Sequence, residues 1–112
     1  MAEENRTITL MTGTLLGATT TGETVSVGSF KEGNAAISVT AVAGTNPTAD
    51  VIIQHSADGT VWFTHTTFAQ ATAATTEFKT MANFMQFVRA KFTIGGTATP
   101  TFTFSVKMTA KA

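Results

Sequence analysis

The sequence predicts an all-β fold, an antiparallel β-sandwich of about eight strands with a jelly-roll-like arrangement, in one domain covering residues 1–112. Twenty-five of the 112 residues are threonine and nine are phenylalanine, and β-branched and aromatic residues favour strands. Apolar and polar residues alternate between short groups of Gly, Asn, Asp and Pro, as in sandwiches and barrels. An immunoglobulin-like sandwich is the alternative, without its cysteine pair and tyrosine corner, because the chain has no Cys or Tyr.

The first half of the chain predicts four strands. They cover residues 6–16, 23–30, 35–43 and 50–56. The third alternates, with Ile37 and Val39 on one side of the strand and Ser38 on the other. The segment "GTNPTA" is expected to break the chain before the fourth strand, since Gly and Asn tolerate unusual backbone angles and Pro cannot donate to a ladder.

The second half predicts four more strands. They cover residues 61–68, 75–81, 85–94 and 101–109. The segment 79–88 departs most from alternation and allows a short helical turn. "GGTATP" predicts a turn before the last strand. That strand alternates most regularly, with a core side formed by Phe102, Phe104, Val106 and Met108.

The stretch "VIIQHSADGTVWF", residues 51–63, contains the residue types of a candidate site, but its pattern predicts a hairpin. Asp58 can accept hydrogen bonds from nearby amides and Gly59 can take a positive φ. His55 and His65 flank the hairpin and are expected to lie several residues apart along the ladder, out of reach of a shared ion. A zinc site needs three or four ligands and a calcium loop needs several oxygen ligands, so no metal ligand is predicted.

The sequence allows two interpretations of Trp62. An exposed indole can form a flat platform for a sugar, whereas a lone tryptophan in a strand is typical of a core or an interface. The phenylalanines are interpreted as core or interface residues, because nine Phe without Tyr indicate dry packing rather than a polar binding surface.

The sequence predicts no catalytic residue, no cofactor and hence no enzyme. There is no "GxSxG" nucleophile turn and no glycine-rich phosphate loop followed by lysine. Glu3 and Glu4 lie in a terminal segment, where a preorganised pair of carboxylates is not expected. The serines of "GETVSVGSF" lie in a predicted strand.

Charge patterning limits the classes of partner. Charged residues make up 12% of the chain, about half of the usual share of roughly 25%. The seven basic residues balance the seven acidic ones and are scattered, so nucleic-acid binding is not expected. The start is acidic and polar, and no apolar run approaches the roughly 20 residues of a membrane helix. We expect synthesis in the cytoplasm and no membrane partner. Low charge favours an exterior covered by neighbouring subunits, although threonine hydroxyls can also solubilise a surface.

The segments "VIIQHSADGTVWFTHTTF" and "FVRAKFTIGGTATPTFTFSVKM" together resemble a pattern of small β-sandwich virion proteins of tailed phages. In that pattern an "S-x-D-G-x-x-W" hairpin is followed by a "V-R-A" strand and a final alternating strand. The resemblance implies a capsid cement or decoration protein on the capsid surface of the virion, without catalysis. Its implied partners are the major capsid protein and further copies of itself.

The polar segment of residues 1–6 is expected to act as an N-terminal arm. We expect Glu3, Glu4 and Arg6 to make polar contacts with neighbouring subunits. Two other functions stay open from the sequence: a carbohydrate- or receptor-binding module of a phage tail or fibre, with Trp62 as its platform, and a ring-forming tail-tube or connector subunit.

Overall fold

The computed structural model describes residues 5–17, 19–27 and 32–111, and these are all-β. The strands are β1 (Asn5–Leu16), β2 (Thr20–Thr21), β3 (Val25–Ser26), β4 (Glu32–Ser56), β5 (Phe63–Thr67), β6 (Thr75–Ala82) and β7 (Phe87–Lys111). None of these residues forms a helix that could cross a membrane. The all-β prediction is confirmed.

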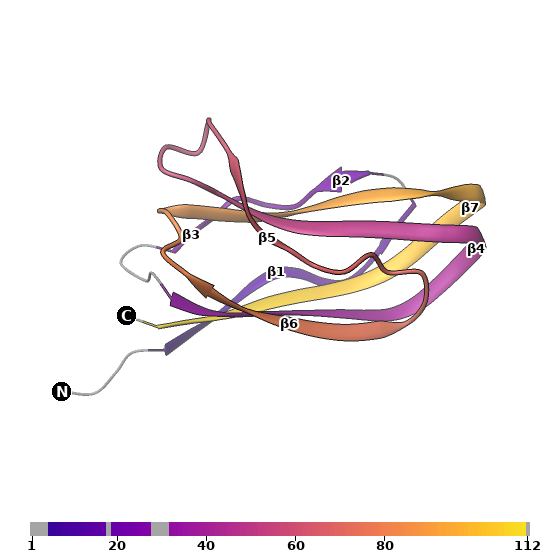
Figure 1. The fold of residues 1–112 in the computed structure, drawn as a ribbon, viewed down its shortest axis with the longest axis horizontal. Coiled ribbons are helices and arrows are strands. Elements are labelled where there is room, and N and C mark those ends of the chain that lie inside the picture. Colours follow the sequence, from indigo (N-terminus) through magenta and orange to yellow (C-terminus); the bar gives the residue numbers. More distant parts are fainter. Residues whose placement is uncertain (1–4, 18, 28–31, 112) are drawn as a thin grey trace.

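Strands β4 and β7 form one long antiparallel ribbon that folds back on itself. Their pairing runs from Glu32 opposite Lys111 to Ser56 opposite Phe87. The register shifts three times, between Val39 and Ala41 and on both sides of Thr45, and Figure 1 shows the ribbon turning sharply at one end of the molecule. The predicted breaks at "GTNPTA" and "GGTATP" are wrong in one respect: the chain bends there but its strands continue, because each half of the ribbon keeps pairing with the other.

The bent ribbon supplies the centre of two layers. In the first layer the order is β1, the second half of β7, the first half of β4, and β6. In the second layer β2 and β3 pair with the first half of β7, which pairs with the second half of β4 and then β5. When the two halves of β4 and of β7 are counted as separate strands, one in each layer, the strand order of the two layers is that of a jelly roll. The chain therefore does not adopt the immunoglobulin-like alternative.

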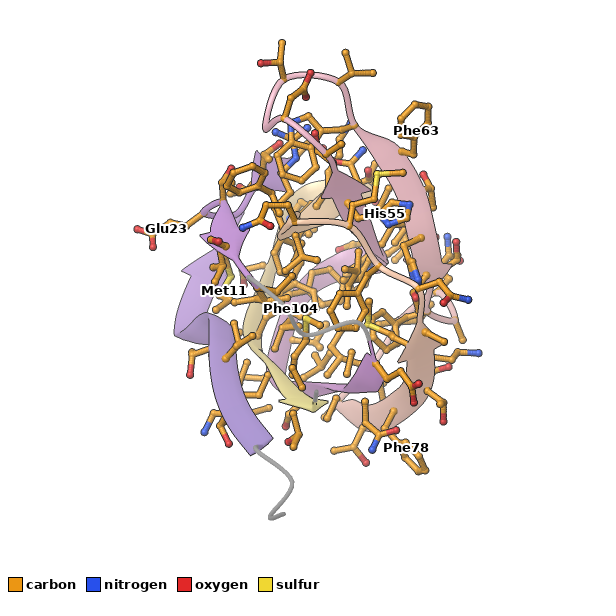
Figure 2. The ribbon with its side chains drawn as sticks, turned by 90° about the vertical axis from the view of Figure 1, so that its left-hand side faces the viewer. Met11, Glu23, His55, Phe63, Phe78 and Phe104 are labelled. Carbon is orange, nitrogen blue, oxygen red and sulfur yellow. The ribbon has the colours of Figure 1, made fainter. Side chains whose placement is uncertain are left out.

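The core lies between the layers and follows the predicted alternation. Phe92, Phe102 and Phe104 are fully buried. The ring centroids of Phe92 and Phe104 are 4.8 Å apart and those of Phe102 and Phe104 are 5.6 Å apart. Each such side chain contributes roughly 1.5–3 kcal/mol through burial. Dry packing is confirmed for these rings, but Phe63 is 54% exposed and Phe78 is 69% exposed. Figure 2 shows both outside the ribbon and Phe104 inside it.

Two other predicted segments differ from the structure. Within the described residues 23–27 of the predicted strand 23–30, only β3 forms, and residues 28–31 lie outside the described part of the chain. The helical turn allowed within residues 79–88 is wrong: β6 continues to Ala82, Asn83 takes a φ of 57°, and β7 begins at Phe87. Asparagine tolerates this left-handed conformation, so the chain crosses between the layers in a tight turn.

Candidate functional site at the hairpin tip

The loop between β4 and β5 projects away from the two layers (Figure 1). The expected turn forms there, with Gly59 at a φ of 80°. It is longer than predicted, because β5 begins at Phe63 rather than at Val61. Val61 and Trp62 therefore belong to the turn and not to a strand.

Ser56 and Asp58 hold this turn through a dense set of hydrogen bonds. The Ser56 hydroxyl accepts from the amides of Asp58 (3.2 Å) and Gly59 (2.9 Å) and donates to Asp58 Oδ1 at 3.0 Å. Asp58 Oδ1 also accepts from the amides of Thr60 (2.8 Å) and Val61 (3.0 Å). The hydrogen bonds from Val61, Thr60 and Ser56 hold the pKa of Asp58 below its usual value. The turn is therefore rigid, and Ser56, which is fully buried, is a residue that sequence reasoning missed.

His55 and His65 are in contact, so the prediction that they lie apart along the ladder is wrong. Their ring centroids are 4.8 Å apart and the rings meet edge to face. The longer turn sets His55 opposite Phe63, and a register shift between Ile53 and Gln54 leaves His65 as the extra residue on β5 between Thr64 and Thr66. The described residues include no group of three or more His, Cys, Asp or Glu side chains that could hold a metal ion.

Both histidines fasten the connection between β6 and β7. His65 Nε2 donates to the Ala82 carbonyl at 2.7 Å, and its Nδ1 lies 2.6 Å from the Thr66 hydroxyl. His55 Nδ1 accepts from the Met85 amide at 3.2 Å, which requires that nitrogen to be unprotonated. Burial, and then the charge of His65, lower the pKa of His55. His55 therefore favours the neutral imidazole, and the evident role of the pair is structural.

Trp62 is half-buried and lies outside the core. The Arg89 guanidinium carbon lies 4.0 Å from the centroid of the indole ring, within the range of a cation–π interaction. Arg89 Nε donates to Gln54 Oε1 at 2.8 Å. Sequence reasoning missed Arg89 and Gln54, which lie opposite each other on β7 and β4. Only the register of those strands could have revealed them.

The predicted arm residues lie mostly outside the part of the chain that the structure describes. Glu3 and Glu4 lie outside the described residues, and Arg6 belongs to β1, where its backbone lies opposite Ala110. Asn5 is also part of β1. The interface predicted for Glu3, Glu4 and Arg6 stays a prediction.

A second surface feature lies on the outer face of the first layer. A shallow hollow of about 410 Å³ adjoins Phe78 and is lined by residues of β4, β6 and β7, of which half are small: Ala36, Ser38, Thr76 and Ser105. Glu77, at its edge, accepts a hydrogen bond from the Ala69 amide at 3.0 Å and lies 3.4 Å from Lys79. Its carboxylate is therefore already engaged in contacts within the fold.

Comparison with known proteins gives a structural likeness. No family model matches the sequence, and no curated protein matches it. The chain is similar to a chain of the solved "Structure of infectious bursal disease virus Gx strain", with a TM-score of 0.57 and 13% identity. The match covers 97% of this chain and 32% of the viral chain, so this chain spans about a third of the length of its viral counterpart. At this identity the likeness shows the fold alone: a jelly-roll sandwich like one found in a virus.

Proposed function

We propose that the chain is a non-catalytic structural protein of a phage virion, a cement or decoration protein that binds and stabilises the head shell. The observation that carries the proposal is the likeness of 97% of the chain to part of a viral chain. Jelly rolls recur in viral capsid proteins. The resemblance of the "SADGTVW" and "FVRAKF" segments to small phage proteins points the same way. The proposed partners are the major capsid protein and further copies of the chain.

The outer surface of the first layer supports a role in assembly. Most of its exposed residues carry neutral side chains, including Thr7, Thr9, Asn34, Ala36, Thr40, Thr76, Phe78, Thr80 and Thr109, whereas Glu32 and Lys107 are charged. Covering hydroxyls and methyl groups costs less desolvation energy than covering charges. A surface of this kind can be buried against neighbours while the molecule stays soluble before assembly.

The test is co-sedimentation of the purified chain with empty shells assembled from the major capsid protein of the same virus. We expect binding that saturates at a fixed number of copies per shell, and shells that disassemble at a higher temperature when decorated, because a ligand of the assembled state stabilises it. A chain that stays in the supernatant at all concentrations would contradict the proposal.

Trp62 supports a second candidate function, a carbohydrate- or receptor-binding module of a tail or fibre. The indole lies outside the core, beside two side chains that can form hydrogen bonds, Arg89 and Gln54. This candidate predicts that free sugars shift the emission of Trp62 and protect it from quenching by iodide. A tail-tube or connector subunit, in contrast, would form rings, which a mass measurement in solution detects.

A further inference from the structure

Three consecutive large apolar residues are displayed at the projecting tip. Val61 is 55% exposed and Phe63 is 54% exposed, and Trp62 between them is half-buried. Such a run on a surface adds to the risk of aggregation unless it serves a function, and exposed apolar patches mark sites of interaction. The fold does not require these side chains at the tip, because the turn is held by Ser56 and Asp58.

The tip is preorganised for binding. Five hydrogen bonds centred on Ser56 and Asp58 fix the turn. Just below it, His65 ties β5 to the Ala82 carbonyl. A rigid loop loses little conformational entropy on binding, so more of its contact energy appears as affinity.

Arg89 adds an unneutralised positive charge to this surface. Its guanidinium is held between Trp62 and Gln54, and within the described residues no carboxylate lies within ion-pair distance of it. Lys91 also has no ion pair there, and it follows two positions along β7, on the same outer face, since Val88, Ala90 and Phe92 point into the core. A planar guanidinium held in place suits bidentate binding of a carboxylate.

We propose that Val61, Trp62 and Arg89, here called the tip patch, form a docking surface for a protein whose own surface presents an acidic side chain within an apolar surround. Phe63 is not part of the patch, because it pairs with His55 and therefore faces the other side of β5 from the Gln54–Arg89 pair. This inference rests on the proposed function, under which that protein is the capsid shell protein. Tryptophan and arginine are the residue types that dominate binding energy at protein interfaces. Arg89 covers one face of the Trp62 ring, which removes a face that a sugar would stack on, and the exposed apolar side chain of Val61 beside it favours a protein.

Two substitutions test the tip patch: Trp62→Ala removes its centre, and Arg89→Met removes the charge while keeping an apolar stem. Each is expected to weaken binding to shells of the same virus by roughly 30-fold, the loss typical of a central interface residue. Binding by the natural chain should also weaken as salt is raised, and Arg89→Met should flatten that dependence. The matched control is Thr93→Ala: Thr93 is an exposed residue of β7, four positions along the strand from Arg89 and opposite Asp50. It belongs neither to the tip patch nor to the outer surface of the first layer, so the substitution is expected to leave binding unchanged.

The outcomes separate this inference from the function on which it rests. If the natural chain binds shells and both tip variants, folded by circular dichroism, bind equally well, the tip patch is wrong and the shell-binding function stands. If the natural chain does not bind shells, both fail. If free N-acetylneuraminic acid binds with the same dependence on Trp62 and Arg89, the occupant is an acidic sugar and the protein partner is wrong.

Discussion

The two ends of the sandwich are closed by different chemistry. At the bend of the ribbon the main chain itself is constrained: Gly44 (φ 103°), Asn46 (φ 48°) and Gly96 (φ 129°) lie in left-handed or related conformations. At the opposite end, which carries the tip, side chains hold the turns through the hydrogen bonds of Ser56, Asp58, His55 and His65. The contacts at the bend involve no titratable side chain, whereas those at the tip end involve Asp58, His55 and His65. Only the tip end should therefore respond to pH, and it is also the end that displays the apolar patch.

The largest effect is expected at the bend, from Gly96→Ala. The added Cβ would lie 2.7 Å from the Asn46 carbonyl oxygen, and the φ of 129° is one that side-chain-bearing residues rarely adopt. We expect a loss of about 3 kcal/mol in the free energy of unfolding, the upper range for a strained backbone residue, measured by urea denaturation. The loss should be the same at pH 5.5 and 7.5. A loss under about 0.5 kcal/mol would show that the bend relaxes without its glycine.

A smaller effect is expected at the tip end from Ser56→Ala. The substitution leaves the amides of Asp58 and Gly59 without their acceptor, and Ser56 is fully buried. We expect a loss of about 1–2 kcal/mol, the usual cost of an unsatisfied hydrogen-bonding group. Ser38→Ala is the matched control, because Ser38 is a half-buried serine on the outer face of the first layer; it should change stability by less than about 0.5 kcal/mol. Equal effects from the two serines would refute the role given to Ser56.

These two regions also show which features of the fold can be predicted from the sequence and which cannot. Alternation predicts the strands because the two-residue period of side chains is written directly in the chain, and the Asp58–Gly59 turn follows from local chemistry. The continuity of β4 and β7 through their bends cannot be predicted from local sequence, since Gly and Pro usually end a strand. The contact of His55 with His65 depends on a register shift between Ile53 and Gln54. Arg89 meets Gln54 across 35 positions of sequence, so only strand pairing brings them together.

The pH dependence of stability isolates the histidine pair. Because the pKa of His55 is lowered in the fold, the unfolded chain takes up a proton first as the pH falls. His55 thus contributes stability above an unfolded pKa of about 6.5, and that contribution is lost as the pH falls from about 6.5 towards the folded pKa. Protonated Nδ1 could no longer accept from the Met85 amide. The other titrating group facing it is His65.

The matching variant is His55→Asn, whose amide oxygen can still accept from the Met85 amide but does not titrate. We expect its urea midpoint to vary less between pH 7.5 and 5.5 than that of the natural chain. The Gly96→Ala variant, changed at the other end, should keep the full pH dependence. An unchanged slope in His55→Asn would assign the pH dependence to other groups.

The smallest effect is expected from Val61→Ser at the tip itself. Val61 is 55% exposed, and its contact with the turn is made by its backbone amide, which donates to Asp58 whatever the side chain. We expect a change in the free energy of unfolding of less than about 0.5 kcal/mol, measured by urea denaturation beside Ser56→Ala. Two residues of one turn would then differ in kind, the buried polar one holding the fold and the exposed apolar one contributing nothing to it. A loss above about 1 kcal/mol would mean that the Val61 side chain packs within the turn. Val61 would then not be available to a partner and would no longer belong to the tip patch.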